Sequence, residues 1–244
     1  MPEVNEFGLP VGDVVRDWEP RPRPEPVTLT GRYVRVVPLS SAHYAELFTT
    51  TCGPDDGALW TYRPIDRPAT LPDLWMHLAA LEESAVDLTF TLVPTEGDHA
   101  GVPAGLASYL RIEPHTGQIE VGGILFAGAL QRTRAATEAI HLLMRHAFDE
   151  LGYRRFEWKC DSLNQPSRRA AARLGFVYEG RFRNHMITKG RNRDTDWFSV
   201  TDGEWPAVRA AHERWLDPAN FDADGRQITA LSELTSDLAG DRTA

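Results

Sequence analysis

Apolar positions along the middle of the chain follow two spacings, one typical of strands and one typical of helices. Four short apolar runs, each bounded by turn-forming residues, predict strands. These runs are 33–37, 88–93, 105–112 and 118–126. The clearest helix falls within 140–151, where apolar residues recur at i, i+3, i+4, i+7, i+8 and i+11 and so share one face. Gly152 follows at a place where a helix end favours a left-handed residue.

Capping signals and further periodic segments extend this pattern toward both ends. Ser40 is placed to cap a short helix, and Thr70 with Asp73 three residues later resembles a capping box for a second one. The second helix is expected to turn an apolar stripe inward, made of Leu71, Leu74, Trp75, Leu78 and Leu81. After residue 152 the predicted elements are strands over 154–161, 176–182, 185–189 and 195–200, and helices over 167–174 and 205–215.

Mixed strands and helices with at least one strand–helix–strand crossover predict an α/β (α+β) layered fold. Residues 18–26 read WEPRPRPEP, and prolines at this density exclude a helix or a central strand. We therefore divide the chain into a proline-rich N-terminal arm over 1–27, a main domain over 28–216 and a polar C-terminal tail over 217–244. Within the tail, 228–239 predicts one marginal helix.

Composition narrows the function classes. The chain has 244 residues and a formal net charge of -9, so a general nucleic-acid-coating role is excluded, because phosphate binding favours a basic surface. No apolar run is long enough to span a bilayer, and the first residues lack the pattern of a secretory signal. Cys52 and Cys160 give no disulfide framework, and the eight histidines show no metal-binding spacing. We expect a cytoplasmic protein without a structural metal.

The segment 119–137 carries the most informative chemistry. A strand leads through a short loop into the long helix, so unpaired backbone amides are expected at the positive end of the helix dipole. Such a place binds phosphate groups, and Arg132 and Arg134 add side-chain charge to it. The alternative from the residues alone is an ordinary strand–helix turn with solvated arginines.

Two motifs around this segment give a specific resemblance. Gln131 to Ala136 follows the pattern Gln/Arg-x-x-Gly-x-Gly/Ala, except that Arg134 stands in place of the middle glycine. Further on, Asn164 and Ser167 precede a short helix that ends in Leu-Gly-Phe at 174–176. In this order and separation, the motifs resemble the acyl-CoA-binding core of the GNAT superfamily of N-acetyltransferases over about residues 28–205. The ribosomal-protein-alanine N-acetyltransferase (Rim-type) branch is the most similar.

The resemblance implies a mostly antiparallel sheet in which two parallel strands, 120–126 and 156–161, splay apart to hold the pantetheine arm of acetyl-CoA. Gly122 and Gly123 suit a β-bulge that opens the splay, although paired glycines also simply weaken a strand. The residues that the resemblance assigns to acetyl-CoA are Ile124, Leu125, Phe126, Gln131, Arg132, Thr133, Arg134, Ala135, Ala136, Thr137, Asn164, Ser167 and Arg168. Arg134 either supplies an extra cation to a phosphate or marks a damaged site.

The implied reaction is attack of an amine on a thioester, which needs a general base because the amine arrives protonated. Glu120 lies eleven positions before Gln131, where several members of the superfamily place this base. The alternative is a surface carboxylate or one paired with an arginine. A tyrosine that often protonates the leaving thiolate is replaced by Ala171, so Ser167 becomes the substitute, with helix N-capping as its alternative role.

The sequence therefore predicts an acetyl-CoA-dependent N-acetyltransferase that acts by direct transfer on a primary amine. The acceptor is a protein N-terminal α-amino group, as the branch resemblance implies, or a small-molecule amine. The basic segment 181–193 is a candidate for binding a carboxylate of the acceptor, or else a solubilising hairpin. The alternative class is a non-catalytic acyl-CoA sensor, and the arm and tail also suggest a homodimer.

Overall fold

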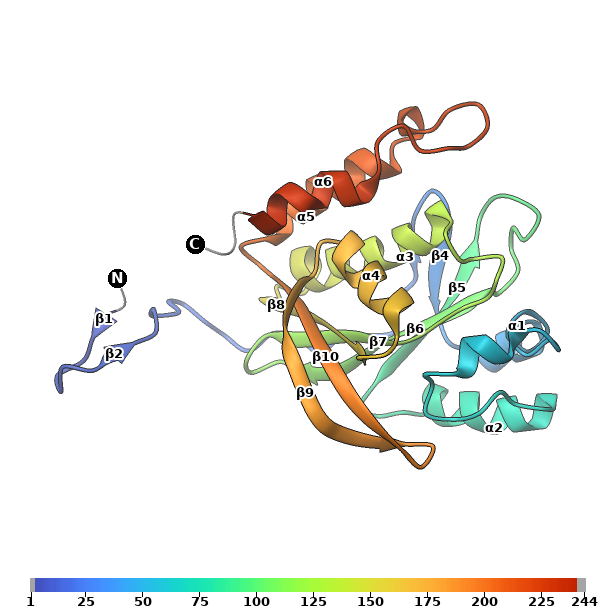
Figure 1. Ribbon diagram of the computed structural model, residues 1–244, viewed down its shortest axis with the longest axis horizontal. Coiled ribbons are helices and arrows are strands. Elements are labelled where there is room, and N and C mark those ends of the chain that lie inside the picture. The colour runs from blue at the N-terminus through green and yellow to red at the C-terminus, as the bar shows by residue number, and fades with distance from the viewer. Residues whose placement is uncertain (1–2, 241–244) are drawn as a thin grey trace.

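An eight-stranded sheet forms the centre of the protein, of which we describe residues 3–240 from a computed structural model, with side chains described to residue 236. The strand order is β3-β4-β5-β6-β7-β8-β10-β9 (Figure 1). All neighbouring strands are antiparallel except β7 and β8, which run parallel. The strands are β3 (Leu29–Thr30), β4 (Val34–Pro38), β5 (Leu88–Pro94), β6 (Gly105–Glu113), β7 (Gln118–Phe126), β8 (Arg155–Asp161), β9 (Val177–Thr188) and β10 (Arg191–Thr201).

Helices cover both faces of this sheet and divide the core in two (Figure 1). On one face lie α1 (Tyr44–Thr51) and α2 (Leu71–Glu82), which enclose the smaller cluster of buried residues. On the other face lie α3 (Arg134–Arg145), α4 (Gln165–Arg173) and α5 (Trp205–Leu216), which enclose the larger one. A π-helical turn, His146–Glu150, extends α3. The predicted α/β layered fold, mostly antiparallel with one parallel pair, is confirmed.

Local signals placed most elements correctly. Thr70 and Asp73 form the predicted capping box at the start of α2, since each side chain binds the other residue's backbone amide. The side chain of Ser40 accepts a hydrogen bond from the amide of Ala42, at the short 3-10 turn that leads into α1. Gly152 has the expected left-handed conformation, with φ of 71°. These devices act within a few residues, so the sequence shows them directly.

Three details differ from the expectation. Trp75, which was assigned to the inward stripe of α2, is 44% exposed and packs edge-on against Tyr44. The helix expected over 167–174 begins at Gln165, because Asn164 provides its cap. The strands expected over 176–182 and 185–189 are one strand, β9, which continues through an irregularity at Asn184, where φ is 49°.

The two ends of the chain attach to the body differently. The N-terminal arm carries a small hairpin of β1 (Glu3–Val4) and β2 (Pro10–Val11), which projects away from the body (Figure 1). Near the C-terminus, α6 (Leu231–Gly240) packs against α4 and α5 and buries Leu231 in the larger core cluster. The division into arm, domain and tail stays a prediction. Within the described residues, no helix is long and apolar enough to cross a membrane.

Candidate active site

The parallel strands β7 and β8 pair over only part of their length. Their register runs from Gln118 opposite Arg155 to Val121 opposite Trp158, and there the pairing stops. Beyond this point each strand bonds only to its other neighbour, β6 or β10. The facing backbone edges of 122–126 and 159–161 are therefore open to an extended ligand, which is the splay that the resemblance implied.

A β-bulge in β7 opens this splay. Leu106 lies opposite Leu125 and Ser108 lies opposite Gly122, so two residues of β7, Gly123 and Ile124, face a single residue of β6. Gly123 has φ of 60°, a left-handed conformation that favours glycine. The predicted bulge at the glycine pair is confirmed.

Arg63 reaches this bulge from the connection between α1 and α2. Its Nη1 donates to the carbonyl oxygens of Gly123 and Ile124. The guanidinium is buried, and this burial lowers the pKa of Arg63 to about 10. The sequence did not reveal this contact, because the two segments are sixty residues apart and no local pattern links them.

Glu120 lies on β7 just before the bulge, with its side chain only 4% exposed. Its Oε2 atom takes two cations, Arg111 Nη1 at 2.6 Å and Lys159 Nζ at 2.8 Å. The sequence left open whether Glu120 pairs with an arginine, and the structure shows that it pairs with Arg111. The other oxygen, Oε1, points along the strand toward the bulge, because a methyl group on Gly122 would lie 3.0 Å from it. Oε1 therefore lies beside Gly122, the residue just before the bulge.

Glu120 is the start of a chain of alternating charges across the sheet. Lys159 also contacts Glu157 Oε2 at 2.7 Å and lies 3.8 Å from the centre of the Trp197 ring. Glu157 in turn binds Arg155 at 2.7 Å. Sequence reasoning missed Lys159, although the alternation in β8 places it on the same face as Glu157. Burial of such charges is tolerated only because each finds an opposite partner.

The loop before α3 has the form expected of an anion site. Thr133 caps the helix, and its Oγ1 accepts a hydrogen bond from the amide of Ala136 at 3.2 Å. The amides of Arg134 and Ala135 belong to the first turn and have no intrahelical partner. Arg132 is exposed and has φ of 61°, a conformation that costs energy in a non-glycine residue and is often found at functional sites.

Position 134 does not need the glycine of the family pattern for its backbone angles, because Arg134 is the first residue of α3 and has no left-handed φ. Its side chain turns away to Glu96, at 2.8 Å, and lies over the rings of Tyr33 and Phe221. The guanidinium is thus paired with Glu96 in this structure, and the extra phosphate cation considered for Arg134 stays a prediction.

The start of α4 brings two further candidates beside β8. The Oδ1 atom of Asn164 accepts from the amide of Ser167 at 3.1 Å, so Asn164 is the helix cap, and the alternative capping role for Ser167 is wrong. The hydroxyl of Ser167 instead accepts from Trp158 Nε1 at 3.0 Å. Burial raises the pKa of the neighbouring Cys160 thiol to about 11, which keeps it neutral and unreactive.

Other predicted residues are distributed around the splay. Arg168 pairs with the fully buried Asp196 at 2.8 Å, and Thr137 accepts a hydrogen bond from Arg173 at 3.0 Å. The side chain of Gln131 donates to the carbonyl oxygen of Phe126 at 3.0 Å and so ties the loop to the end of β7. The remaining apolar candidates, Ile124, Leu125, Ala135 and Ala136, are buried or partly buried.

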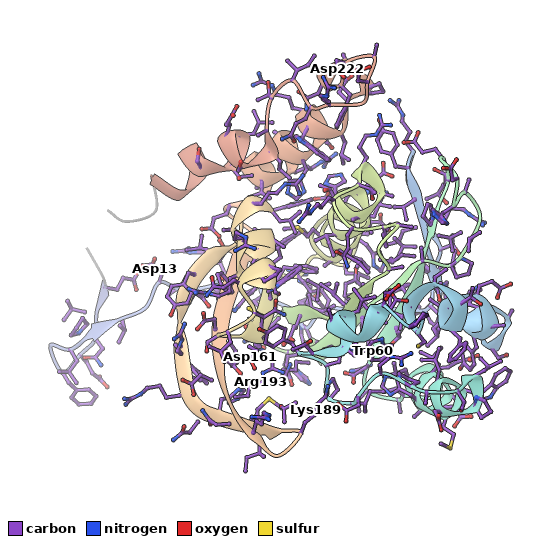
Figure 2. All side chains as sticks on the ribbon, turned by 45° about the vertical axis from the view of Figure 1, so that its right-hand side comes forward. Asp13, Trp60, Asp161, Lys189, Arg193 and Asp222 are labelled. Atoms are coloured by element: carbon purple, nitrogen blue, oxygen red, sulfur yellow. The ribbon has the colours of Figure 1, made fainter. Side chains whose placement is uncertain are left out.

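The 60–66 segment contacts both the tip of the β9–β10 hairpin and the start of α4 near the splay. Lys189, at the tip of the β9–β10 hairpin, contacts the carbonyl oxygen of Trp60 at 2.7 Å and Asp66 at 3.0 Å. The hydroxyl of Tyr62 donates to the carbonyl oxygen of Leu163 at 3.1 Å. Trp60, Lys189 and Arg193 lie on the same side of the molecule in Figure 2. The 60–66 segment and the hairpin tip thus frame the space next to the bulge.

Comparison with known proteins agrees with this geometry. Residues 34–177 match the model of the acetyltransferase (GNAT) domain, and the chain belongs to this family. A crystal structure of a GCN5-related N-acetyltransferase from Brucella melitensis is 44% identical, with a TM-score of 0.88, over 91% of this chain and 100% of that one. The family match supports acetyl transfer as the general chemistry.

Two further relatives give weaker support for the chemistry, because one match is short and the other is low in sequence identity. An uncharacterized N-acetyltransferase derived from the SPbeta prophage, YokL of Bacillus subtilis (strain 168), is 37% identical over 70 residues, which span 29% of this chain and 40% of that protein. RimL, a ribosomal L7/L12 alpha-N-protein acetyltransferase, is 17% identical with a TM-score of 0.62, over 72% of this chain and 94% of that one. The second likeness shows the fold alone.

Proposed function

We propose that the protein transfers an acetyl group from acetyl-CoA directly to a primary amine, with Glu120 as the general base. The observation that carries this proposal is the position of Glu120 Oε1, which faces the bulge where β7 and β8 separate. A base must lie within hydrogen-bond reach of the proton it removes, directly or through one water. Here a buried carboxylate oxygen lies beside open backbone edges.

The chain's own groups suit the parts of acetyl-CoA. The first-turn amides of α3, at Arg134 and Ala135, are donors for the diphosphate, with the helix dipole behind them. The open edges of 122–126 and 159–161 are the donors and acceptors for the amides of the pantetheine arm. Arg63 fixes the carbonyl groups of the bulge, so the backbone there is held in one orientation.

In the transfer, the amine nitrogen forms an amide bond and the thioester C–S bond breaks. Glu120 Oε1 takes the proton that the amine loses, while Arg111 and Lys159 hold Oε2. The Ser167 hydroxyl, on the first turn of α4, is the candidate that gives a proton to the leaving sulfur while it takes one from water. The acceptor is a protein N-terminal α-amino group, as the Rim-type resemblance suggests, or a small-molecule amine.

The test compares Glu120→Gln with Glu113→Gln, a matched change at an exposed carboxylate of β6. Thiol release from acetyl-CoA is followed with a panel of amines and N-terminal peptides, and coenzyme A binding is measured by calorimetry. Glu120→Gln should lower kcat/KM by about 10²–10⁴-fold, the usual contribution of a general base, and leave coenzyme A affinity unchanged. Glu113→Gln should behave as wild type.

Other outcomes separate the parts of this proposal. Wild-type turnover in Glu120→Gln would remove the carboxylate from the mechanism. Coenzyme A binding without turnover on any amine would favour an acyl-CoA sensor, an alternative raised by Arg134 in the loop and by Ala171 in place of the tyrosine. Absence of binding heat with both coenzyme A and acetyl-CoA would refute the assignment as a whole.

A further inference from the structure

The N-terminal arm exposes an unusual density of apolar side chains. Over residues 3–15, six large apolar residues are each at least 38% exposed: Val4, Phe7, Leu9, Val11, Val14 and Val15. They lie on and beside the β1–β2 hairpin, which projects from the body (Figure 1). Exposed apolar side chains gathered in one place mark an interaction surface more often than isolated ones do.

The arm is anchored at its base and free beyond it. Trp18 Nε1 donates to the carbonyl oxygen of His115 at 2.8 Å, and the amide of Arg21 donates to that of Pro114 at 3.0 Å. Tyr153 donates to the carbonyl oxygen of Pro22 at 3.1 Å. Across the described residues, no hydrogen bond or ion pair joins 3–17 to the body. The fixed base therefore presents the hairpin outward.

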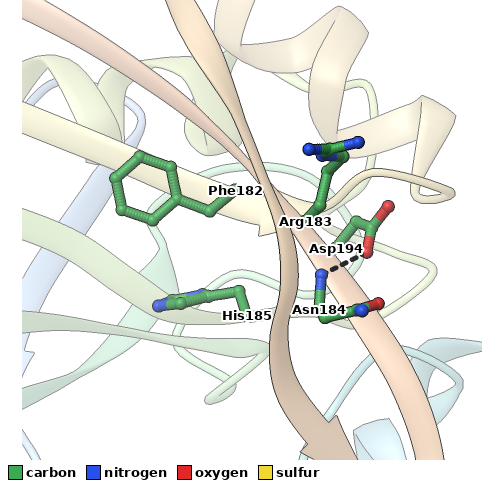
Figure 3. Close-up of a pocket in the computed structure, with 5 residues that line it drawn as sticks. All are labelled: Phe182, Arg183, Asn184, His185 and Asp194. Carbon is green, nitrogen blue, oxygen red and sulfur yellow. Dashed lines mark hydrogen bonds between the residues drawn. The ribbon is translucent and has the colours of Figure 1, made fainter.

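The β9–β10 hairpin offers a second exposed apolar surface. β9 is the last strand of the sheet, so its outer edge has no partner strand among the described residues. Phe182, Met186 and Ile187 on this strand are 40–83% exposed. A hollow of about 780 Å³ is lined by Phe182, Arg183, Asn184, His185 and Asp194, which are drawn in Figure 3. An exposed strand edge with apolar side chains is a template for a further segment.

The two surfaces carry opposite charge. Residues 3–17 contain Glu3, Glu6, Asp13 and Asp17 against the single Arg16. The whole β9–β10 hairpin, residues 177–201, contains five basic residues against Glu179, Asp194 and Asp196. Arg181 and Lys189 are paired within the chain, but in the described structure Arg183, Arg191 and Arg193 have no ion-pair partner. An acidic apolar arm thus complements a basic apolar hairpin.

We propose that the arm of one chain docks on the β9–β10 hairpin of a second copy, and the reverse, in a closed dimer. Every copy carries both surfaces, so a two-fold arrangement satisfies both arms at once. A second copy is the favoured occupant because the arm leads away from its own body and the complementary surface is present on the same chain. The carboxylates of the arm then meet the unpaired arginines while Phe7 and Leu9 cover Phe182 and Met186, which share one face of the hairpin.

The test measures molar mass by light scattering and sedimentation with the full chain at micromolar concentrations. The wild type should have twice the monomer mass of 27.3 kDa. A double variant, Arg183→Glu with Arg191→Glu, should weaken the dimer by about tenfold or more, since like charges then face each other. Glu3→Lys with Glu6→Lys should do the same, and the four changes together should restore association. Val86→Ser, at an exposed apolar site elsewhere, is the control.

Three results would overturn the proposal. They are a monomeric wild type, a dimer that survives removal of residues 1–15, and a combined four-residue variant no tighter than its parents. Coenzyme A binding measured on each variant shows that the body is folded, so loss of association is assigned to the surfaces. The proposal is independent of Glu120, and its failure leaves the catalytic test untouched.

Discussion

Glu138 offers a sharp test of how α3 is held in place. This buried carboxylate accepts hydrogen bonds from three consecutive amides of the turn between β3 and β4, at Arg32, Tyr33 and Val34, with distances of 2.9, 2.6 and 3.0 Å. The preceding residue, Gly31, lies so close that a methyl group there would collide with Glu138 Oε2. Removing the carboxylate therefore leaves the three amides of the turn without a hydrogen-bond partner. Adding a methyl group to Gly31 displaces the carboxylate from these amides.

The magnitude follows from the number and type of these bonds. A hydrogen bond to a charged group contributes about 1.5–3 kcal/mol, but the three share two oxygens and the freed amides regain some water. Glu138→Ala should therefore lower the free energy of unfolding by about 3–5 kcal/mol. Gly31→Ala should cost about 2–3 kcal/mol in the wild type, as overpacking does, and under about 1 kcal/mol when Glu138 is already alanine.

Denaturant unfolding, followed by tryptophan fluorescence, gives all four corners of this double-mutant cycle. Gly31 has no left-handed φ, so the alanine is not penalised by its backbone angles and the cycle reports the contact. A loss below about 1 kcal/mol for Glu138→Ala, or strictly additive effects of the two changes, would refute the reasoning. Equal m-values across the set are needed for the comparison.

Two other predictions concern the bulge and the buried histidines. Arg63→Met should lower kcat/KM by about 10–100-fold because the carbonyl of Gly123 loses its fixed donor, and Arg63→Lys should recover part of it in the same thiol-release assay. Burial lowers the pKa of His141 to about 4 and that of His212 to about 3. The unfolded chain protonates both near pH 6.5 while the folded one stays neutral, so stability should be constant above that pH and fall by about 3 kcal/mol per histidine toward pH 4. The urea midpoint of unfolding, measured between pH 7 and 4.5, checks this. A midpoint that does not change with pH would contradict the prediction, and so would a pH dependence of the midpoint that is the same in His212→Gln as in the wild type.

The parts of the fold that the sequence predicted well depend on short-range chemistry. The strand over 118–126 has the predicted bounds, and the glycine pair within it forms the expected bulge. Thr70 and Asp73 are three residues apart, so their capping box is visible in the sequence. Even so, the exposed Trp75 shows that helical spacing predicts a face and not how far the neighbouring layer extends over it.

The parts that the sequence could not show depend on register between distant strands. Lys159 meets Glu120 because β7 and β8 pair in parallel with Glu120 opposite Glu157, and nothing local fixes that alignment. Arg63 meets the bulge for the same kind of reason. Arg134 pairs with Glu96 in the loop after β5, a contact that required the fold before it could be seen.

The charge network bears on the proposed role of Glu120 as a base, because this carboxylate is paired with two cations. If Glu120 gains a proton on Oε1, Lys159 still has Glu157 at 2.7 Å, so no buried cation is left without a partner. Arg111, the other partner, has a side chain that is 49% exposed, and water can solvate it. The large penalty for breaking a buried ion pair comes from the charge that is left behind, and here neither cation is stranded. Loss of the Glu120 charge would thus leave Lys159 with Glu157 and Arg111 with water, which is what the proposed role of Glu120 as a base requires of its partners.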